Sequence, residues 1–168
     1  MTVRSLRRER PPVEVAADER MLAWAPLLGG AWAVGTRDAL YLPGVRLPWE
    51  QVQAADWDHD LSRLRVSEVG RRGGRRVEHH LTLDESGRSA DRLLQLVRER
   101  VTASVLLVRH VPITGRRGVR VVARRAPSGR RPVEWVYEYD EGIDPADPLV
   151  ETALATALVD ARSEVGLE

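Results

Sequence analysis

Short runs of alternating apolar and polar residues, separated by tight turns, occupy the first half of the chain. They predict strands at about 20–28, 31–36, 38–43, 46–57, 63–69 and 75–83. Gly29-Gly30 and Pro43-Gly44 lie between successive runs, as in the turns of an antiparallel meander. The pattern therefore predicts a mainly β protein in which consecutive strands pair with one another.

A helical pattern follows at residues 89–101. Ser89 is expected to cap this helix, and Asp91 suits the positive end of the helix dipole. The apolar stripe is formed by Leu93, Leu94, Leu96, Val97 and Val101. Six antiparallel strands followed by an amphipathic helix predict a curled sheet with one open end closed by the helix.

A second unit is predicted after this helix, with strands at 105–111, 119–125 and 133–140. A final helix is expected to begin near Asp144-Pro145, because Asp is a good cap and Pro suits the first helical position. Its apolar stripe contains Val150, Leu154, Ala157, Leu158, Ala161 and Val165. We therefore divide the chain into a mobile N-terminal arm (1–17), a β unit with its closing helix (18–104), and a three-stranded sheet plus helix packed on it (105–168).

The second unit also allows a prediction of strand register. If the hairpin loop is centred on Gly129, Arg124 faces Glu134 and Arg120 faces Glu138. The opposite face then carries an apolar stripe of Val119, Val121, Ala123, Trp135, Tyr137 and Tyr139. Because exposed charges usually form solvated faces, we expect the arginines and glutamates to face solvent and neutralise one another.

Composition narrows the possible classes of protein. The chain has 168 residues, 43% of them hydrophobic, which suffices for a packed core. It contains no cysteine, which excludes disulfides and thiolate chemistry and fits a reducing cytoplasm. No apolar run approaches the length of a membrane span. All 26 basic residues are arginines, but the formal net charge is only +1, which gives no general case for nucleic-acid binding.

The segments Thr36-Arg-Asp-Ala-Leu-Tyr41, Leu47-Pro-Trp-Glu-Gln-Val52 and Ala55-Asp-Trp57, followed by Leu64-Arg-Val66, resemble small bacterial pleckstrin-homology-like domains. This resemblance covers residues 18–104 and implies a curled antiparallel sheet closed by a helix, with a tendency to bind a partner. The chain also contains the segments Leu96-Val-Arg-Glu-Arg-Val-Thr-Ala-Ser-Val105 and Glu138-Tyr-Asp-Glu-Gly-Ile-Asp-Pro-Ala-Asp147. With these it resembles, over nearly its whole length, a conserved family of hypothetical proteins from high-GC actinobacteria, a resemblance that implies no activity and no catalytic residue.

Large apolar side chains of the first unit are expected to share one core with the closing helix. The predicted core contains Trp24, Trp32, Leu40, Leu47, Val66, Leu81, Leu94 and Val97. Trp49 directly follows Pro48 at a strand entrance, so we expect it to be the tryptophan that is partly exposed.

Three clusters of polar residues suggest chemistry, each with a simpler structural explanation. Asp56, Asp58, His59 and Asp60 provide metal-ligand atoms, but they lack calcium-loop spacing and fall at a turn, where Asp makes local hydrogen bonds. His79 and His80 point to opposite faces of a strand. Ser104 and His110 share a predicted strand, without an identifiable acid. We therefore expect no metal site, no cofactor and no catalytic residue.

The remaining candidates are arginines in loops, which have no acid nearby in the sequence. Weak ligand-binding residues are predicted at Arg71, Arg72, Arg75, Arg76, Arg116, Arg117, Arg130 and Arg131. We expect the chain to be a non-enzymatic cytoplasmic binding or interaction module. Two alternatives stay open, an anion-binding domain for membrane headgroups or nucleic acid that uses these loops, and a hydrolase-type enzyme. A protein partner would require an exposed apolar patch or an unpaired sheet edge.

Overall fold

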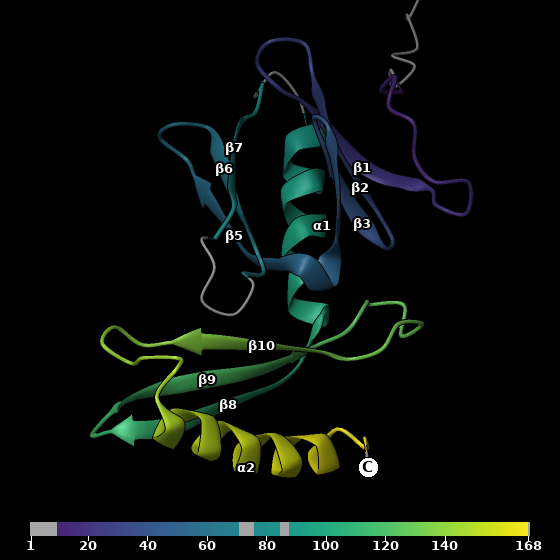
Figure 1. The fold of residues 1–168 in the computed structure, drawn as a ribbon. Helices are drawn as coiled ribbons and strands as arrows, with labels where there is room; N and C mark the ends of the chain where they lie inside the picture. The colour runs from purple at the N-terminus through teal and green to yellow at the C-terminus, as the bar shows by residue number, and fades with distance from the viewer. Residues whose placement is uncertain (1–9, 71–75, 85–87, 168) are drawn as a thin grey trace, which may run out of the picture.

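The computed structural model describes residues 10–70, 76–84 and 88–167. Within these ranges the chain forms three antiparallel sheets and two α-helices, so the prediction of a mainly β protein is confirmed. Figure 1 shows the first two sheets on either side of helix α1, and the third sheet with helix α2 as a separate layer below them.

The first unit contains seven strands in two sheets. One sheet has the order β1-β2-β3-β4, with strands Met21–Pro26, Trp32–Thr36, Ala39–Leu42 and Val45–Pro48. The other has the order β5-β6-β7, with strands Val52–Asp58, Arg63–Glu68 and Glu78–Thr82. A bridge between Leu27 and Leu83 joins the ends of β1 and β7.

The long strand predicted at 46–57 is divided in two. A 3₁₀ turn, η1 (Trp49–Gln51), separates β4 from β5 and carries the chain from the first sheet to the second. Pro48 immediately precedes it, and a proline has no N–H group with which to continue a strand ladder. The prediction of six strands was therefore wrong by one.

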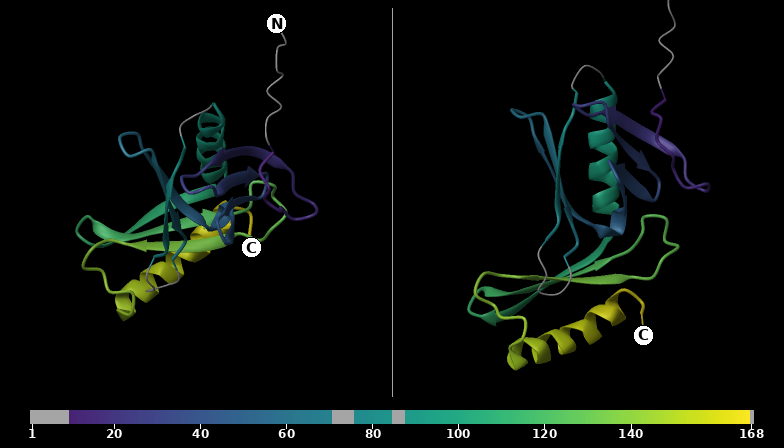
Figure 2. Two further views of the ribbon diagram at one scale, coloured as in Figure 1. Left: turned by 90° about the horizontal axis from the view of Figure 1, so that it is seen from above. Right: turned by 45° about the horizontal axis from the view of Figure 1, so that its top comes forward.

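Helix α1 (Ser89–Ala103) lies between the two sheets, as the views in Figures 1 and 2 agree. Its buried side chains are Ala90, Leu93, Leu96 and Val97. Gly35 of β2 permits this close packing, because a Cβ atom there would stand 2.5 Å from Leu96 Cδ2. Ser89 is not the cap: Arg88 holds the cap position, and no side-chain capping bond forms.

Both tryptophans that were predicted in the core of the first unit lie outside it. The core that joins both sheets and α1 contains Leu40, Leu47, Val66, Leu81 and Val97, as predicted, but neither Trp24 nor Trp32. Gly35 and Ala33 occupy the inner face of β2, so Trp32 falls on the outer face, where it is half-buried.

Trp49, in contrast, is fully buried. The indole Nε1 of Trp49 donates a 3.1 Å hydrogen bond to the carbonyl oxygen of Thr36, and the backbone N–H of Trp49 donates to the carbonyl oxygen of Asp38. The turn η1 directs this ring into the space between the sheets, where it supplies the largest buried side chain of the core. The prediction that Trp49 would be partly exposed was wrong.

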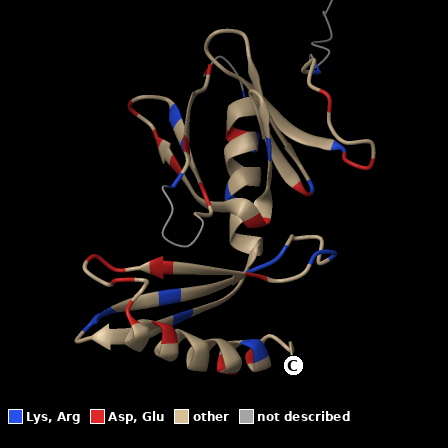
Figure 3. Cartoon of the chain, viewed as in Figure 1, with Lys and Arg blue, Asp and Glu red and all other residues tan. Residues whose placement is uncertain are grey.

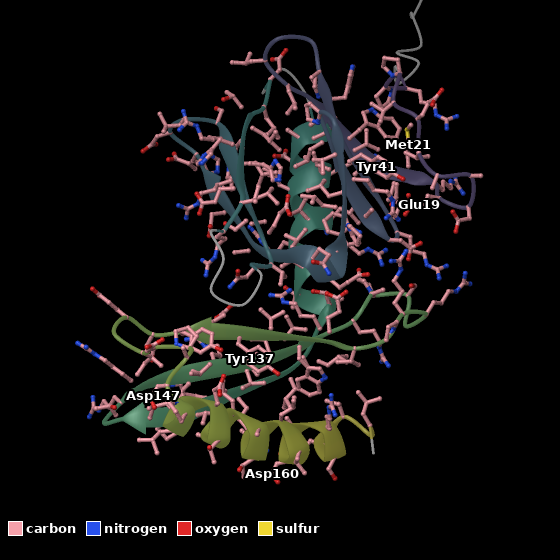
Figure 4. All side chains as sticks on the ribbon, in the orientation of Figure 1. Glu19, Met21, Tyr41, Tyr137, Asp147 and Asp160 are labelled. Atoms are coloured by element: carbon pink, nitrogen blue, oxygen red, sulfur yellow. The ribbon has the colours of Figure 1, made fainter. Side chains whose placement is uncertain are left out.

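The segment before β1 lies against the outer face of the first sheet. Residues 1–17 were expected to form a mobile arm; residues 1–9 lie outside the described part, but Pro11 is buried and Ala16 N donates to the Tyr41 hydroxyl. Tyr41 and Arg46 both hydrogen-bond to the carboxylate of Glu19. Figure 4 labels Glu19 and Tyr41 on this side of the first sheet. Burial raises the pKa of Glu19, but these two partners outweigh it and lower the pKa below its usual value.

The second unit consists of a three-stranded sheet of order β10-β9-β8, with strands Val105–Thr114 (β8), Arg117–Arg124 (β9) and Glu134–Tyr139 (β10). The predicted register is confirmed: Arg124 lies opposite Glu134, and Arg120 opposite Glu138. On the opposite face Trp135, Tyr137 and Tyr139 face the valine side of β9, which creates a surface for α2.

Helix α2 (Pro148–Glu164) packs on this surface through Val150 and Leu154. It begins later than predicted, since Asp147 is the cap and its carboxylate accepts a bond from Leu149 N. Asp144 instead closes a preceding turn by accepting from Ala146 N. Neither α1 nor α2 combines the length and the apolar character of a membrane-crossing helix.

The buried position of Trp49 predicts a large effect of its removal. Trp49→Ala should lower the free energy of unfolding by about 3–5 kcal/mol, because it leaves a cavity between the sheets. Trp24→Ala should cost only about 1 kcal/mol, since its ring is half-buried outside this core. Urea denaturation monitored by far-UV circular dichroism measures both, and equal losses would contradict the assignment.

Candidate functional site

A groove separates strand β5 from helix α1. It has a volume of about 720 Å³ and is open to solvent along one side. Trp57 and His59 line it from β5 and the following turn, and residues of α1 line it from the other side: Arg88, Ala90, Asp91, Leu94, Gln95, Arg98 and Glu99. We take this groove as the candidate site because it combines a concave surface with a strand edge.

Strand β5 forms one wall of the groove and is an edge strand. Among the described strands it pairs with β6 alone. Asp56 and Asp58 are exposed, whereas Ala55 and Trp57 turn toward the core and are half-buried. The ring of Trp57 meets that of His59 edge to face, with centroids 6.0 Å apart. The end of β5 therefore presents an aromatic surface beside a backbone edge without a strand neighbour.

Helix α1 forms the other wall with pairs of side chains that recur about once per helical turn. Leu93, Leu96 and Val97 face the core, so helical periodicity turns Leu94, Gln95 and Arg98 toward the groove. Leu94 is half-buried and provides an apolar surface, while Gln95 and Arg98 are exposed.

The charges of the groove are balanced. Two arginines, Arg88 and Arg98, stand against two acids, Asp91 and Glu99. Glu99 accepts a 2.8 Å hydrogen bond from Gln95 Nε2. An apolar centre with mixed charges around it suits a peptide better than a highly charged anion.

The start of β5 is fixed by a buried arginine from the second unit. Arg124 of β9 is 4% exposed. Its Nη1 donates to the Val52 carbonyl oxygen (2.9 Å) and to Ser104 Oγ (3.0 Å), and its Nη2 donates to the Gln53 carbonyl oxygen (2.9 Å). A β-bulge between Val52 and Ala54 interrupts the β5–β6 ladder there, and the forked guanidinium takes two successive carbonyls.

The charged face of the second unit is thus partly buried, contrary to the expectation of a solvated ladder. Arg120 does pair with Glu138, at 2.8 Å. Glu134, however, accepts a hydrogen bond from Gln51 instead of pairing with Arg124. Burial lowers the pKa of Arg124, an effect that the charge of Glu138 opposes. The sequence predicted the register correctly, but it did not reveal that the first unit covers this face.

Two glutamines of the first unit complete the interface. Gln51 donates to Glu134, and Gln53 Nε2 donates to Glu138 at 2.5 Å. Burial raises the pKa of Glu134, and the nearby carboxylate of Glu50 raises it further, against the bond from Gln51. Burial also raises the pKa of Glu138, but the bonds from Gln53 and Arg120 outweigh it and lower the pKa.

The arginines predicted as ligand-binding residues lie in different places. Arg71, Arg72 and Arg75 fall outside the described residues, and Arg76 is exposed just before β7. Arg116 and Arg117 lie at the β8–β9 turn, whereas Arg130 and Arg131 lie in the loop between β9 and β10, at the opposite end of β9. Figure 3 shows arginine at both places.

These two pairs of arginines are therefore separated by the length of β9. At one end, Arg131 Nε lies 3.9 Å from the buried carboxylate of Glu50. The described arginines thus do not gather at a single point of the surface.

The acidic and histidine clusters make local contacts. Asp58 Oδ1 accepts bonds from the backbone of Asp60 and Leu61, and Asp56 pairs with Arg65 at 3.0 Å. Of the described residues, no three His, Asp or Glu are grouped so as to hold a metal ion.

The histidines and Ser104 likewise have structural partners. His79 contacts Glu68 and His80 contacts Glu78, from opposite faces of β7. Ser104 caps the end of α1, where its hydroxyl donates to Val101 O, and it does not belong to β8. His110 lies 3.6 Å from Asp140.

Sequence reasoning missed the groove. Its two walls are separated in the sequence by 29 positions, from His59 to Arg88, and only the sheet order shows that β5 is an edge strand beside α1. No family model matches the chain, and the searches of curated proteins and of solved structures return no similar protein.

Because its guanidinium is buried, we predict that Arg124 contributes more to the free energy of unfolding than Arg120 of the same strand. Arg124→Met should lower the free energy of unfolding by about 2–4 kcal/mol, because two carbonyls and a hydroxyl lose a charged donor. Arg120→Met, on the same face, should cost about 0–1 kcal/mol, as for an exposed ion pair. Urea titrations of both variants compare them, and equal losses would refute the special role of Arg124.

The raised pKa of Glu134 predicts a pH-dependent contribution to stability. A carboxyl whose folded-state pKa exceeds its ordinary value of 4.5 favours folding below that value and loses this contribution as pH rises through the raised pKa. Glu134→Gln should therefore unfold at higher urea than the unmodified protein at pH 7, with the difference vanishing below pH 4.5. A variant that is less stable at pH 7 would contradict the assignment.

Proposed function

We propose that the chain is a non-enzymatic interaction module that binds an extended peptide segment of a partner protein in the groove between β5 and α1. The observation that supports this proposal is the coincidence of a free strand edge with a concave, apolar-centred groove. An edge strand offers unpaired backbone N–H and C=O groups, and an extended peptide satisfies them by adding as a further strand.

The geometry also suggests which side chains the peptide carries. Alternate residues of an added strand point to the same face. One set would face Trp57 and Leu94, which favours apolar side chains at alternate positions. The other set would face solvent, with Arg98 and Glu99 at the rim to select polar residues.

The second unit supports this role by fixing the strand. Arg124 occupies the carbonyls of Val52 and Gln53, which leaves the part of β5 from Ala54 onward for a ligand. A site held by a rigid scaffold loses less entropy on binding than a mobile one, and its affinity gains accordingly.

For the first unit we propose a pleckstrin-homology-like fold. Its support is the order of elements, a four-stranded sheet followed by a three-stranded sheet and a helix packed between them. For the compartment we propose the cytoplasm, which the absence of cysteine supports.

A random peptide library displayed on phage tests the function. Peptides selected on the unmodified protein should carry apolar residues at alternate positions. They should bind Gln95→Trp about tenfold more weakly or worse, because the new ring fills the groove. Hydrogen exchange should show protection of the amides of residues 54–58 on binding.

Arg92→Trp is the matched control, since it places the same ring on an exposed position of α1 outside the groove. It should bind the selected peptides as the unmodified protein does. If selection returns no peptide, or if the selected peptides bind Gln95→Trp with unchanged affinity, the proposal is wrong.

A further inference from the structure

Strand β8 is also an edge strand, at the outside of the second unit. It is ten residues long and pairs with β9 alone among the described strands. In Figure 1 it is the strand of this sheet drawn nearest to α2, which packs on the apolar face of the sheet. A long edge strand is a template for pairing with another strand unless the fold protects it.

Little on β8 protects this edge. Leu106 and Val108 point away from α2 and are 39% and 54% exposed. The strand's arginine, Arg109, lies on the other face, where it contacts Glu164 and Asp160 of α2. Pro112, which lacks an N–H group, stands near the end of the strand and leaves the centre open.

We propose that β8 pairs antiparallel with β8 of a second copy of this chain, so that the two three-stranded sheets form one continuous sheet across a twofold axis. A twofold axis makes an interface self-complementary, with each residue i facing j and each j facing i. This inference is independent of the groove between β5 and α1.

The charges of β8 and α2 select the register. Residues directly opposite in an antiparallel pair share a face, so a twofold axis at Arg109 sets Arg109 against its own copy and Val108 against His110. Two arginines alone would repel one another. Each arginine, however, has two carboxylates of α2 beside it. It contacts Glu164 directly, and its Nη1 lies 3.6 Å from Oδ2 of Asp160, whose side chain is 66% exposed.

Four carboxylates then surround two guanidinium groups, which gives each copy an acidic partner for the other's arginine. This register also overlaps residues 105–113 of both strands, which is nearly the whole of β8. The second copy is therefore favoured over an unrelated strand by charge complementarity and by the match in strand length.

Sedimentation velocity across a range of protein concentrations tests the proposal. The unmodified protein should form a dimer. Val108→Lys should raise the dimer dissociation constant by about tenfold or more, because charged edge residues oppose strand pairing. Val159→Lys is the matched control, since Val159 is 69% exposed on α2. It should leave the dimer intact. Far-UV circular dichroism verifies that both variants fold.

Cysteine substitution tests the register, because the chain contains no cysteine of its own. The double variant Val108→Cys/His110→Cys, which keeps Arg109, should oxidise to a disulfide-linked dimer, since residue 108 of one copy faces residue 110 of the other. His110→Cys alone should form no disulfide-linked dimer, because residue 110 faces residue 108 of the other copy. A monomeric unmodified protein, a Val108→Lys dimer of unchanged affinity, a dimer lost in Val159→Lys, or a disulfide-linked dimer formed by His110→Cys alone would each overturn the proposal.

Discussion

The arrangement of the two units depends on one buried cation. Arg124 belongs to β9 by sequence, but its guanidinium group is bound by the first unit, through the carbonyls of Val52 and Gln53 and the hydroxyl of Ser104. A guanidinium stays protonated in proteins, so its burial requires compensating acceptors. The bulge in β5 supplies two of them at once. Separation of the units would leave these carbonyls without their donor.

This contact links the interface to the candidate site, because both use the same strand. The first residues of β5 rest on β9 and β10, and the last ones, with Trp57, line the groove beside α1. Ser104 ends α1, so the same guanidinium contacts both walls of the groove at one end. The interface and the groove therefore share strand β5 and lie at the two ends of the same contact network.

The sequence determined local pairing better than it determined packing between distant elements. The register of Arg120 with Glu138 was predictable because alternation fixes which residues face each other. The burial of Trp49 was not predictable, since it depends on a 3₁₀ turn that interrupts what the sequence reads as one continuous strand. Arg124 was predicted to be a solvated charge because the two carbonyl groups that it binds, of Val52 and Gln53, lie about seventy residues away in the sequence. The groove required knowledge of the sheet order.

Residual dipolar couplings of the backbone amides measure the relative orientation of the two units most directly. If Arg124 holds them together, couplings from residues 18–70, 76–84 and 88–104 and from residues 105–167 fit one alignment tensor in the arrangement of Figure 2. In Arg124→Met the two sets should require separate tensors, because the shared donor is lost. Two tensors in the unmodified protein, or a single tensor that Arg124→Met leaves unchanged, would contradict this account.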